Sequence, residues 1–129
     1  FHRPKTGLRT RVGRALAGAQ LYPPYCSPCH QGKGKGDGPR FPPLDGSEWV
    51  TGDKRRLIEV VLKGLEGPIT VKGQPFMGVM PGNDFLEDEE IAQILTYIRM
   101  SFGNEVGGVR EDEVRRVRRM VARAAEATP

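Results

Sequence analysis

Apolar residues recur at helical spacing in two well-marked stretches of the chain. Between residues 53 and 63 the pattern begins after Asp53 or Thr51 as an N-cap and ends at Gly64. Between residues 87 and 102 acidic side chains occupy the first turn and Gly103 follows the last. The sequence therefore predicts a helix in each stretch. The apolar positions are Leu57, Ile58, Val61 and Leu62 in the first and Ile91, Ile94, Leu95 and Ile98 in the second.

Two further helices are expected, one toward each end of the chain. A run rich in small residues predicts a helix from about residue 11 to Tyr22, where Pro23 and Pro24 should stop or kink it. Residues 111–126 predict a last helix with a narrow apolar stripe between arginines, and the stripe must lie against the domain. The stripe consists of Val114, Val117, Met120, Val121 and Ala124.

The middle of the chain predicts a loop and a short hairpin. Residues 31–43 are rich in Gly, Pro and Lys and predict a loop. Residues 69–71 and 74–79 flank Lys72-Gly73 and predict a hairpin that leads to Met80 and Pro81. The predicted fold class is therefore mainly α, with one short β-hairpin.

Length and composition suggest one domain completed by something apolar. The 129-residue chain has the size of a single domain, but its 37% hydrophobic content is low for a protein core. No run approaches the ~20 apolar residues of a membrane span, and the basic N-terminus lacks the apolar stretch of a signal peptide. We expect a mature chain whose core includes an apolar cofactor.

The motif Cys26-Ser27-Pro28-Cys29-His30 carries the most specific chemistry. Thioether attachment of haem needs two thiols on one turn and a histidine directly after them that reaches the iron. A structural zinc site would need four ligands, but the only other histidine is His2 and there is no second cysteine pair. A thiol redox pair would sit in a βαβ context, which this helical pattern does not predict. The motif therefore predicts one covalent haem c with His30 as an iron ligand.

A methionine is expected as the second axial ligand, because a closed six-coordinate iron changes oxidation state with little rearrangement and a thioether favours Fe(II). Met100 and Met120 lie at helical spacing and are expected in the core or at a docking surface. Met77 lies in the predicted hairpin, whereas Met80 follows it and precedes Pro81, which fixes the loop. We favour Met80, with Met77 as the alternative.

The chain resembles class I bacterial cytochromes c, especially the soluble carriers of thermophilic respiratory chains and the haem domains fused to their oxidases. The resemblance covers about residues 12–104 and implies helices around one covalently bound haem, with a short β-hairpin before the axial methionine. Residues 1–11 are then a basic extension, and residues 105–129 are an extra C-terminal helix packed on the domain. The matching motifs are Cys26–His30, Phe41–Ser47, Gly67–Val71, Gly78–Pro81 and Asp88–Ile91.

The resemblance also assigns roles to individual residues. It implies that the Pro42 carbonyl accepts a hydrogen bond from the His30 ring, and that Trp49 and Arg40 bind the haem propionates, with a packed core aromatic as the alternative for Trp49. It implies a helix crossing at which Gly18 and Tyr22 meet Ile94 and Tyr97. The expected cofactor-binding residues are Cys26, Cys29, His30, Arg40, Pro42, Leu44, Trp49 and Tyr97. The apolar residues expected against the haem are Leu44, Ile58, Val61, Ile69, Val79 and Leu95.

These features predict a single-electron carrier and not an enzyme. The resemblance implies a monomer that passes electrons from a quinol-oxidising donor to a haem-copper oxidase in the periplasm, peripheral to the membrane or anchored to it. Lys33, Lys35 and Lys72 are expected to rim an exposed haem edge and to steer acidic partners. The alternative is an excised haem domain of an oxidase subunit or a dehydrogenase.

Other classes of function fit less well. A gas sensor or peroxidase needs an open sixth position on the iron, which an axial Met80 would close. The formal net charge of +4 and the arginine-rich last helix raise the question of nucleic-acid binding. However, aromatic residues are sparse in that helix and four acidic residues dilute its charge, so no nucleic-acid partner is expected.

Overall fold

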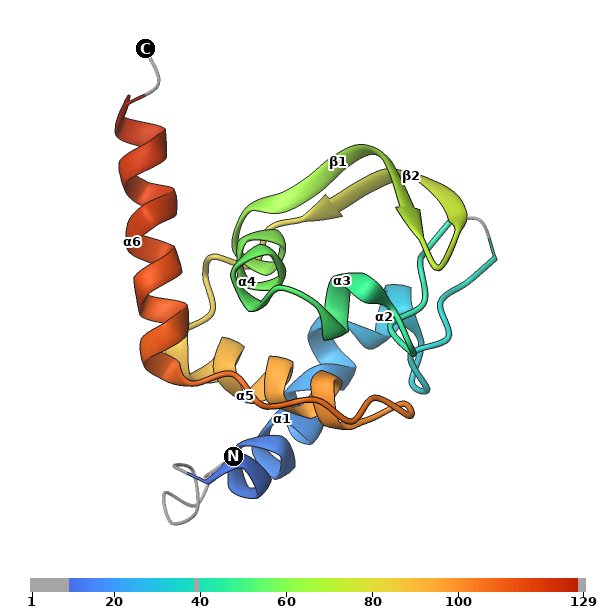
Figure 1. Cartoon of the computed structure of the whole chain (residues 1–129), viewed down its shortest axis with the longest axis horizontal. Coiled ribbons are helices and arrows are strands. Elements are labelled where there is room, and N and C mark those ends of the chain that lie inside the picture. The colour runs from blue at the N-terminus through green and yellow to red at the C-terminus, as the bar shows by residue number, and fades with distance from the viewer. Residues whose placement is uncertain (1–9, 39, 128–129) are drawn as a thin grey trace.

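A computed structural model describes residues 10–38 and 40–127 and confirms a mainly helical chain with one hairpin. Helices α1 and α5 cross on one side of the molecule, and α3, α4 and the hairpin lie on the other (Figure 1). In the described residues no helix is both long and apolar enough to span a bilayer. The elements are α1 (Arg11–Tyr25), α2 (Ser27–His30), α3 (Glu48–Thr51), α4 (Lys54–Lys63), β1 (Gly64–Val71), β2 (Gln74–Pro81), α5 (Asp88–Met100) and α6 (Glu111–Ala127).

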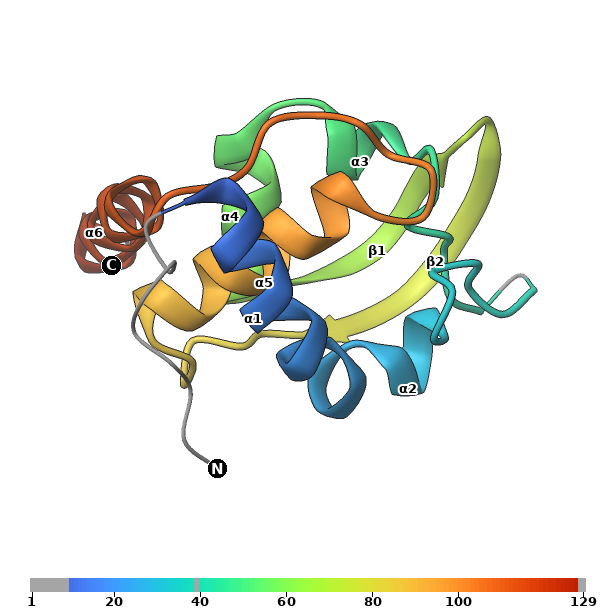
Figure 2. The ribbon, with the colours of Figure 1, turned by 90° about the horizontal axis from the view of Figure 1, so that it is seen from below.

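Helix α1 crosses α5 at a point where a side chain would not fit (Figure 2). A Cβ atom on Gly18 would lie 1.9 Å from the carbonyl oxygen of Gln93 and 2.8 Å from Cβ of Tyr97. The Tyr22 ring contacts Tyr97 and Phe102, with centroid separations of 5.5 and 5.4 Å. The predicted crossing is confirmed for Gly18, Tyr22 and Tyr97, with Gln93 as the residue directly beneath the glycine.

Of the two outcomes expected at the prolines, a stop or a kink, the stop at Tyr22 is wrong, because the helix continues through Pro23 and Pro24 to Tyr25. Each proline removes one N–H group from the helical ladder, but its fixed φ is compatible with helical backbone. The ladder resumes at Cys26, whose N–H donates to the Tyr22 carbonyl at 2.9 Å. The continuous helix therefore delivers Cys26 directly to the short helix α2.

The hairpin is longer than predicted and includes Met80. Strands β1 and β2 are antiparallel, and their register pairs Leu65 with Met80 and Ile69 with Phe76. Lys72 and Gly73 form the turn with φ values of 51° and 77°, as a tight two-residue hairpin turn requires. The longer ladder places Met80 at a fixed position in a strand instead of in a loop.

Helix α6 packs on α4 and α5, and its core-facing residues are Val114, Val117 and Val121. Val114 and Val117 are buried there, whereas Ala124 of the predicted stripe is exposed. Arg118 fixes the helix by donating to the Asp88 carboxylate at 2.7 Å and to the Leu86 carbonyl at 2.6 Å. The remaining turns project past α4 (Figure 1). Residues 1–9 of the predicted basic extension lie outside the described residues.

Buried polar side chains hold the segment that connects α5 to α6 and runs back along α5. Thr96 Oγ1 donates to the Val109 carbonyl and accepts from the Val109 N–H, both at 3.0 Å. Asn104 Nδ2 donates to the carbonyls of Ile98 and Leu44 at 3.0 and 3.1 Å. These hydrogen bonds join the segment to α5 and to the loop that contains Leu44.

Candidate functional site

A largely apolar cavity lies between the hairpin and the helices. The end of α1 and α2 contribute Cys26, Cys29 and His30 to its lining, and β2 contributes Met77 and Met80. Ile58 was expected in the lining but instead belongs to the core behind it, where it is 1% exposed. The other predicted apolar contacts do line the cavity: they are Leu44, Val61, Ile69, Val79 and Leu95.

His30 is held in the orientation and protonation state that suit a metal ligand. Its Nδ1–H donates to the Pro42 carbonyl at 2.9 Å, as the resemblance implied. Burial lowers the pKa of His30, and the Pro42 hydrogen bond opposes that shift. In the part of the chain that the structure describes, Nε2 has no hydrogen-bond partner. The neutral imidazole thus keeps one nitrogen free while the other fixes the ring.

The two cysteines are free thiols on one turn of chain, and the His30 N–H donates to the Cys26 carbonyl at 2.9 Å. Burial raises the pKa of Cys26 to about 11, and the neighbouring Cys29 adds to the shift. A catalytic redox pair requires the opposite, a thiol of lowered pKa. Within residues 10–38 and 40–127 no group of three or more His, Cys, Asp or Glu side chains could hold a metal ion. The surroundings of the pair thus match thioether attachment better than either rival function.

The strand register distinguishes the two candidate methionines. Alternate residues of a strand face opposite sides of the sheet, so Met80 shares a face with Phe76, which is buried. Met77 lies on the other face and is 74% exposed. Met100 and Met120 are both half-buried and do not line the cavity. Both methionines line the cavity, but Met80 is the one that shares the buried strand face of Phe76.

The predicted propionate-binding residues line the cavity, but the Trp49 indole N–H and one Arg40 nitrogen already have partners in the chain. The Trp49 indole N–H donates to the Thr70 carbonyl at 2.9 Å, and the Arg56 guanidinium lies 4.2 Å above the indole ring. Arg40 is exposed and pairs with Asp37. Tyr97 does not line the cavity, because its ring is engaged with Tyr22 at the helix crossing. The expected direct cofactor contact of Tyr97 is therefore not what the structure shows.

Two of the three predicted rim lysines share one carboxylate. Lys35 Nζ lies 2.6 Å from Asp45 Oδ2, and Lys72 Nζ lies 3.8 Å from Asp45 Oδ1. Lys33 is exposed. Because Asp45 offsets part of the positive charge, this rim is less cationic than the lysines alone suggest.

Tyr22 has a second role that the sequence did not reveal. Its hydroxyl donates to the Gln31 carbonyl at 2.6 Å, where the chain leaves α2 with a positive φ. Burial, more than the nearby Cys26 and Tyr97, raises the pKa of Tyr22. The hydroxyl thereby fastens the end of the turn that carries Cys29 and His30.

An apolar macrocycle with two vinyl groups and an iron fits these residues. The end of α1 and α2 bring two thiols and one imidazole to the lining, strand β2 brings two thioether sulfurs, those of Met77 and Met80, and most of the remaining lining is apolar. Cys26 and Cys29 would hold the group covalently, and His30 and Met80 would supply the axial ligands.

Comparisons with known proteins extend the likeness over most of the chain. The family model described as Cytochrome c matches residues 15–101. Cytochrome c-552 of Thermus thermophilus is 40% identical over 126 residues, which are 91% of this chain and 83% of that protein. The cytochrome c subunit of a quinone alcohol dehydrogenase from Gluconobacter oxydans is 36% identical over 105 residues, or 80% of this chain and 22% of that subunit. The cytochrome subunit of a fructose dehydrogenase from Gluconobacter japonicus is 34% identical over 107 residues.

Proposed function

The chain belongs to the cytochrome c family, and from this premise we propose that it carries single electrons from a quinol-oxidising complex to a terminal haem-copper oxidase. Its cofactor is a covalently bound haem c, and the protein transfers electrons without being an enzyme. The bound haem supplies reversible one-electron chemistry at its iron. The observation that carries the proposal is the cavity that gathers two cysteines, one histidine and two methionines, of which Met80 shares the strand face of buried Phe76.

The roles of individual residues in this centre follow from their surroundings. Cys26 and Cys29 would hold the haem through thioether bonds, and His30 and Met80 would be the ligands of its iron. The Pro42 carbonyl orients the His30 ring and makes it more basic. The aliphatic lining excludes water, which favours the less charged ferrous form. With both axial positions filled by protein side chains, gas binding and peroxide chemistry are disfavoured.

Electron transfer between the two complexes is tested by stopped-flow kinetics with the purified holoprotein. The oxidised protein should be reduced by a quinol-oxidising complex and the reduced protein reoxidised by a haem-copper oxidase, both on a millisecond scale. Rapid carbon monoxide binding to the ferrous protein, without electron transfer to either complex, would favour a sensor and refute the carrier.

Partner recognition is proposed to involve the exposed Lys33 and the lysines beside Asp45. Such charges steer encounter and orientation more than they add affinity, so association should weaken as salt rises. A monomer in the periplasm, peripheral to the membrane or anchored to it, fits covalent haem attachment, which bacteria normally perform outside the cytoplasmic membrane. Turnover with the oxidase that is independent of ionic strength would contradict the role of the lysines.

A second candidate function is that of a haem domain in a dehydrogenase. It is favoured by the similarity to the cytochrome subunits of an alcohol dehydrogenase and a fructose dehydrogenase. In each case the alignment covers 22% of the length of that subunit. The same stopped-flow experiment decides between the two, with a quinone-dependent dehydrogenase replacing the quinol-oxidising complex. Reduction by the dehydrogenase alone would favour this second function.

A further inference from the structure

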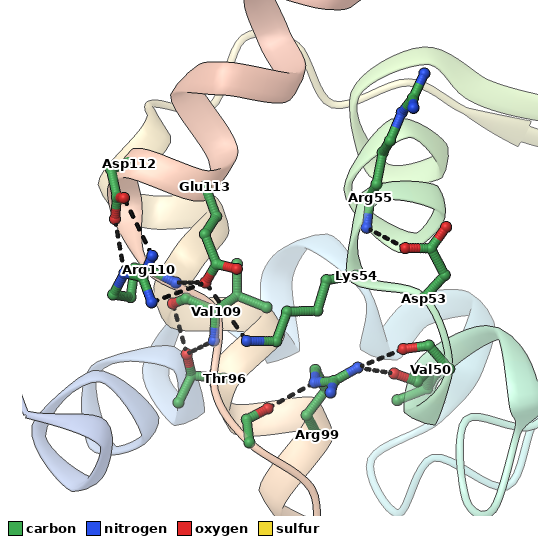
Figure 3. A network of polar contacts seen from close by, with 12 residues as sticks. Val50, Asp53, Lys54, Arg55, Thr96, Arg99, Val109, Arg110, Asp112 and Glu113 are labelled. Carbon is green, nitrogen blue, oxygen red and sulfur yellow. Dashed lines mark hydrogen bonds and ion pairs between the residues drawn. The ribbon is translucent and has the colours of Figure 1, made fainter.

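Arg99 is a buried cation whose hydrogen bonds all go to backbone carbonyls. Its side chain is 5% exposed. Nη1 donates to the carbonyls of Val50 and Gly52 at 2.8 and 3.2 Å, and Nε donates to that of Gly107 at 2.6 Å (Figure 3). An arginine stays protonated in such a site. Over the described residues no carboxylate lies in salt-bridge contact with this guanidinium.

This charge lies directly behind the wall of the cavity. Ile98, the residue before Arg99 on α5, lines the cavity, and so does Val50, whose carbonyl accepts the 2.8 Å hydrogen bond. The guanidinium is therefore joined by a hydrogen bond to a residue of the cavity wall and is itself withdrawn from solvent. A charge in such a low-dielectric region acts more strongly on the cavity than an exposed charge at the same distance.

Glu113 is the carboxylate that acts on Arg99 from a distance. Burial lowers the pKa of Arg99, and Glu113 partly offsets that shift. Glu113 stands in the first turn of α6, where its Oε1 accepts from the Arg110 N–H at 2.9 Å and lies 3.5 Å from Lys54 Nζ (Figure 3). Asp112 is occupied by Arg110. Lys54 and Arg110 thus lie in ion-pair contact with Glu113, and Arg110 also with Asp112, whereas Arg99 has no such contact among the described residues.

We propose that Arg99 raises the reduction potential of the haem and that Glu113 lowers it. Reduction adds one electron to the iron from a one-electron donor, so the centre becomes less positive by one charge and no bond is made or broken. Arg99 stabilises the reduced centre and Glu113 the oxidised one. The inference rests on the proposed haem centre with His30 and Met80, and it makes the docking of α6 a determinant of the potential.

Spectroelectrochemical titration of holoprotein variants tests this. Arg99→Met should lower the midpoint potential, Arg99→Lys should lower it less, and Glu113→Gln should raise it. Glu111→Gln is the matched control, because Glu111 lies two residues from Glu113 and pairs with the exposed Arg115; it should leave the potential unchanged. A ten-fold change in the ratio of reduced to oxidised protein corresponds to about 59 mV for one electron, so a fraction of that change is measurable.

Opposite shifts distinguish an electrostatic role from a structural one. If a substitution merely loosened the cavity wall, water would enter and the potential would fall, both in Arg99→Met and in Glu113→Gln. A lower or unchanged potential in Glu113→Gln would therefore overturn the inference, even if Arg99→Met failed to fold. A wild-type ferric spectrum without the weak long-wavelength band of methionine ligation would instead refute the proposed haem ligation. A normal spectrum with unshifted potentials would refute this inference alone.

Discussion

Replacing Gly18 by alanine should destabilise the protein at the crossing of α1 and α5. The added Cβ would lie 1.9 Å from the Gln93 carbonyl oxygen and 2.6 Å from its carbon, whereas real Cβ contacts essentially never fall below 3.0 Å. The obstacle is backbone in the middle of α5 and cannot rotate away. The two helices must therefore separate by about 1 Å, which disturbs the packing of Tyr22 and Tyr97.

Two opposing contributions set the magnitude of this effect. Alanine gains roughly 1 kcal/mol over glycine inside a helix. Overpacking typically costs about 1–3 kcal/mol, and a clash with backbone belongs at or above the upper end of that range. The net loss in the free energy of unfolding should therefore be about 2 kcal/mol or more, or a fall in Tm of roughly 5–10 °C for a domain of this size.

Thermal and guanidinium unfolding of the holoprotein, followed by circular dichroism and haem absorbance, measures this loss. Gly107→Ala is the matched control, because Gly107 is exposed, has an ordinary φ and would bring its Cβ within 4 Å of nothing. It should change the stability by less than about 0.5 kcal/mol. Equal stability of Gly18→Ala and the wild type, or equal losses in the two variants, would refute the crossing geometry.

Three further predictions concern side chains around the site. Tyr22→Phe removes the donor to the Gln31 carbonyl and should cost about 1–2 kcal/mol in denaturant unfolding at neutral pH. Burial raises the pKa of Tyr22 above that of an unfolded tyrosine, so the stability of the protein should fall as the pH rises above about 10. Tyr22→Phe should reduce that fall in alkaline titrations, and an unchanged alkaline profile would contradict this. Arg118→Gln should cost about 1 kcal/mol and speed proteolysis within α6, since Arg118 holds Asp88 and Leu86, whereas the exposed Arg119→Gln should do neither. Asp45→Asn should increase the association rate with an acidic oxidase at low ionic strength, because it leaves Lys35 and Lys72 without a counter-charge, and the difference should vanish at high salt; Glu126→Gln at the exposed end of α6 is the control.

Elements determined by local chemistry could be predicted closely from the sequence. Helix α4 begins after Asp53, whose side chain accepts from the Arg55 N–H, and it ends at Gly64 with a positive φ. Both signals lie within the element itself, so no tertiary information was needed. The attachment motif and the His30 contact with Pro42 were likewise accessible, the first from spacing and the second from the family resemblance.

Features that depend on tertiary packing were not accessible in this way. The two prolines of α1 predict an end or a kink in the helix, but the helix, which packs on α5, continues to Tyr25. Arg99, Thr96 and Asn104 look like surface residues in a single sequence, because an apolar pattern assigns polar side chains to solvent. Their partners are backbone carbonyls distant in the chain, in the loop before α3, on α3 and in the segment before α6, and only the folded structure brings them together.

The central claim, a haem iron held by His30 and Met80, is tested most directly by optical spectroscopy of two methionine variants. In the ferric wild-type protein, methionine ligation gives a weak long-wavelength absorption band. Met77→Ala should keep this band, because Met77 is 74% exposed. Met80→Ala should lose the band and bind carbon monoxide rapidly when reduced, because the register places Met80 on the strand face of buried Phe76. A band that survives in Met80→Ala and disappears in Met77→Ala would contradict the account.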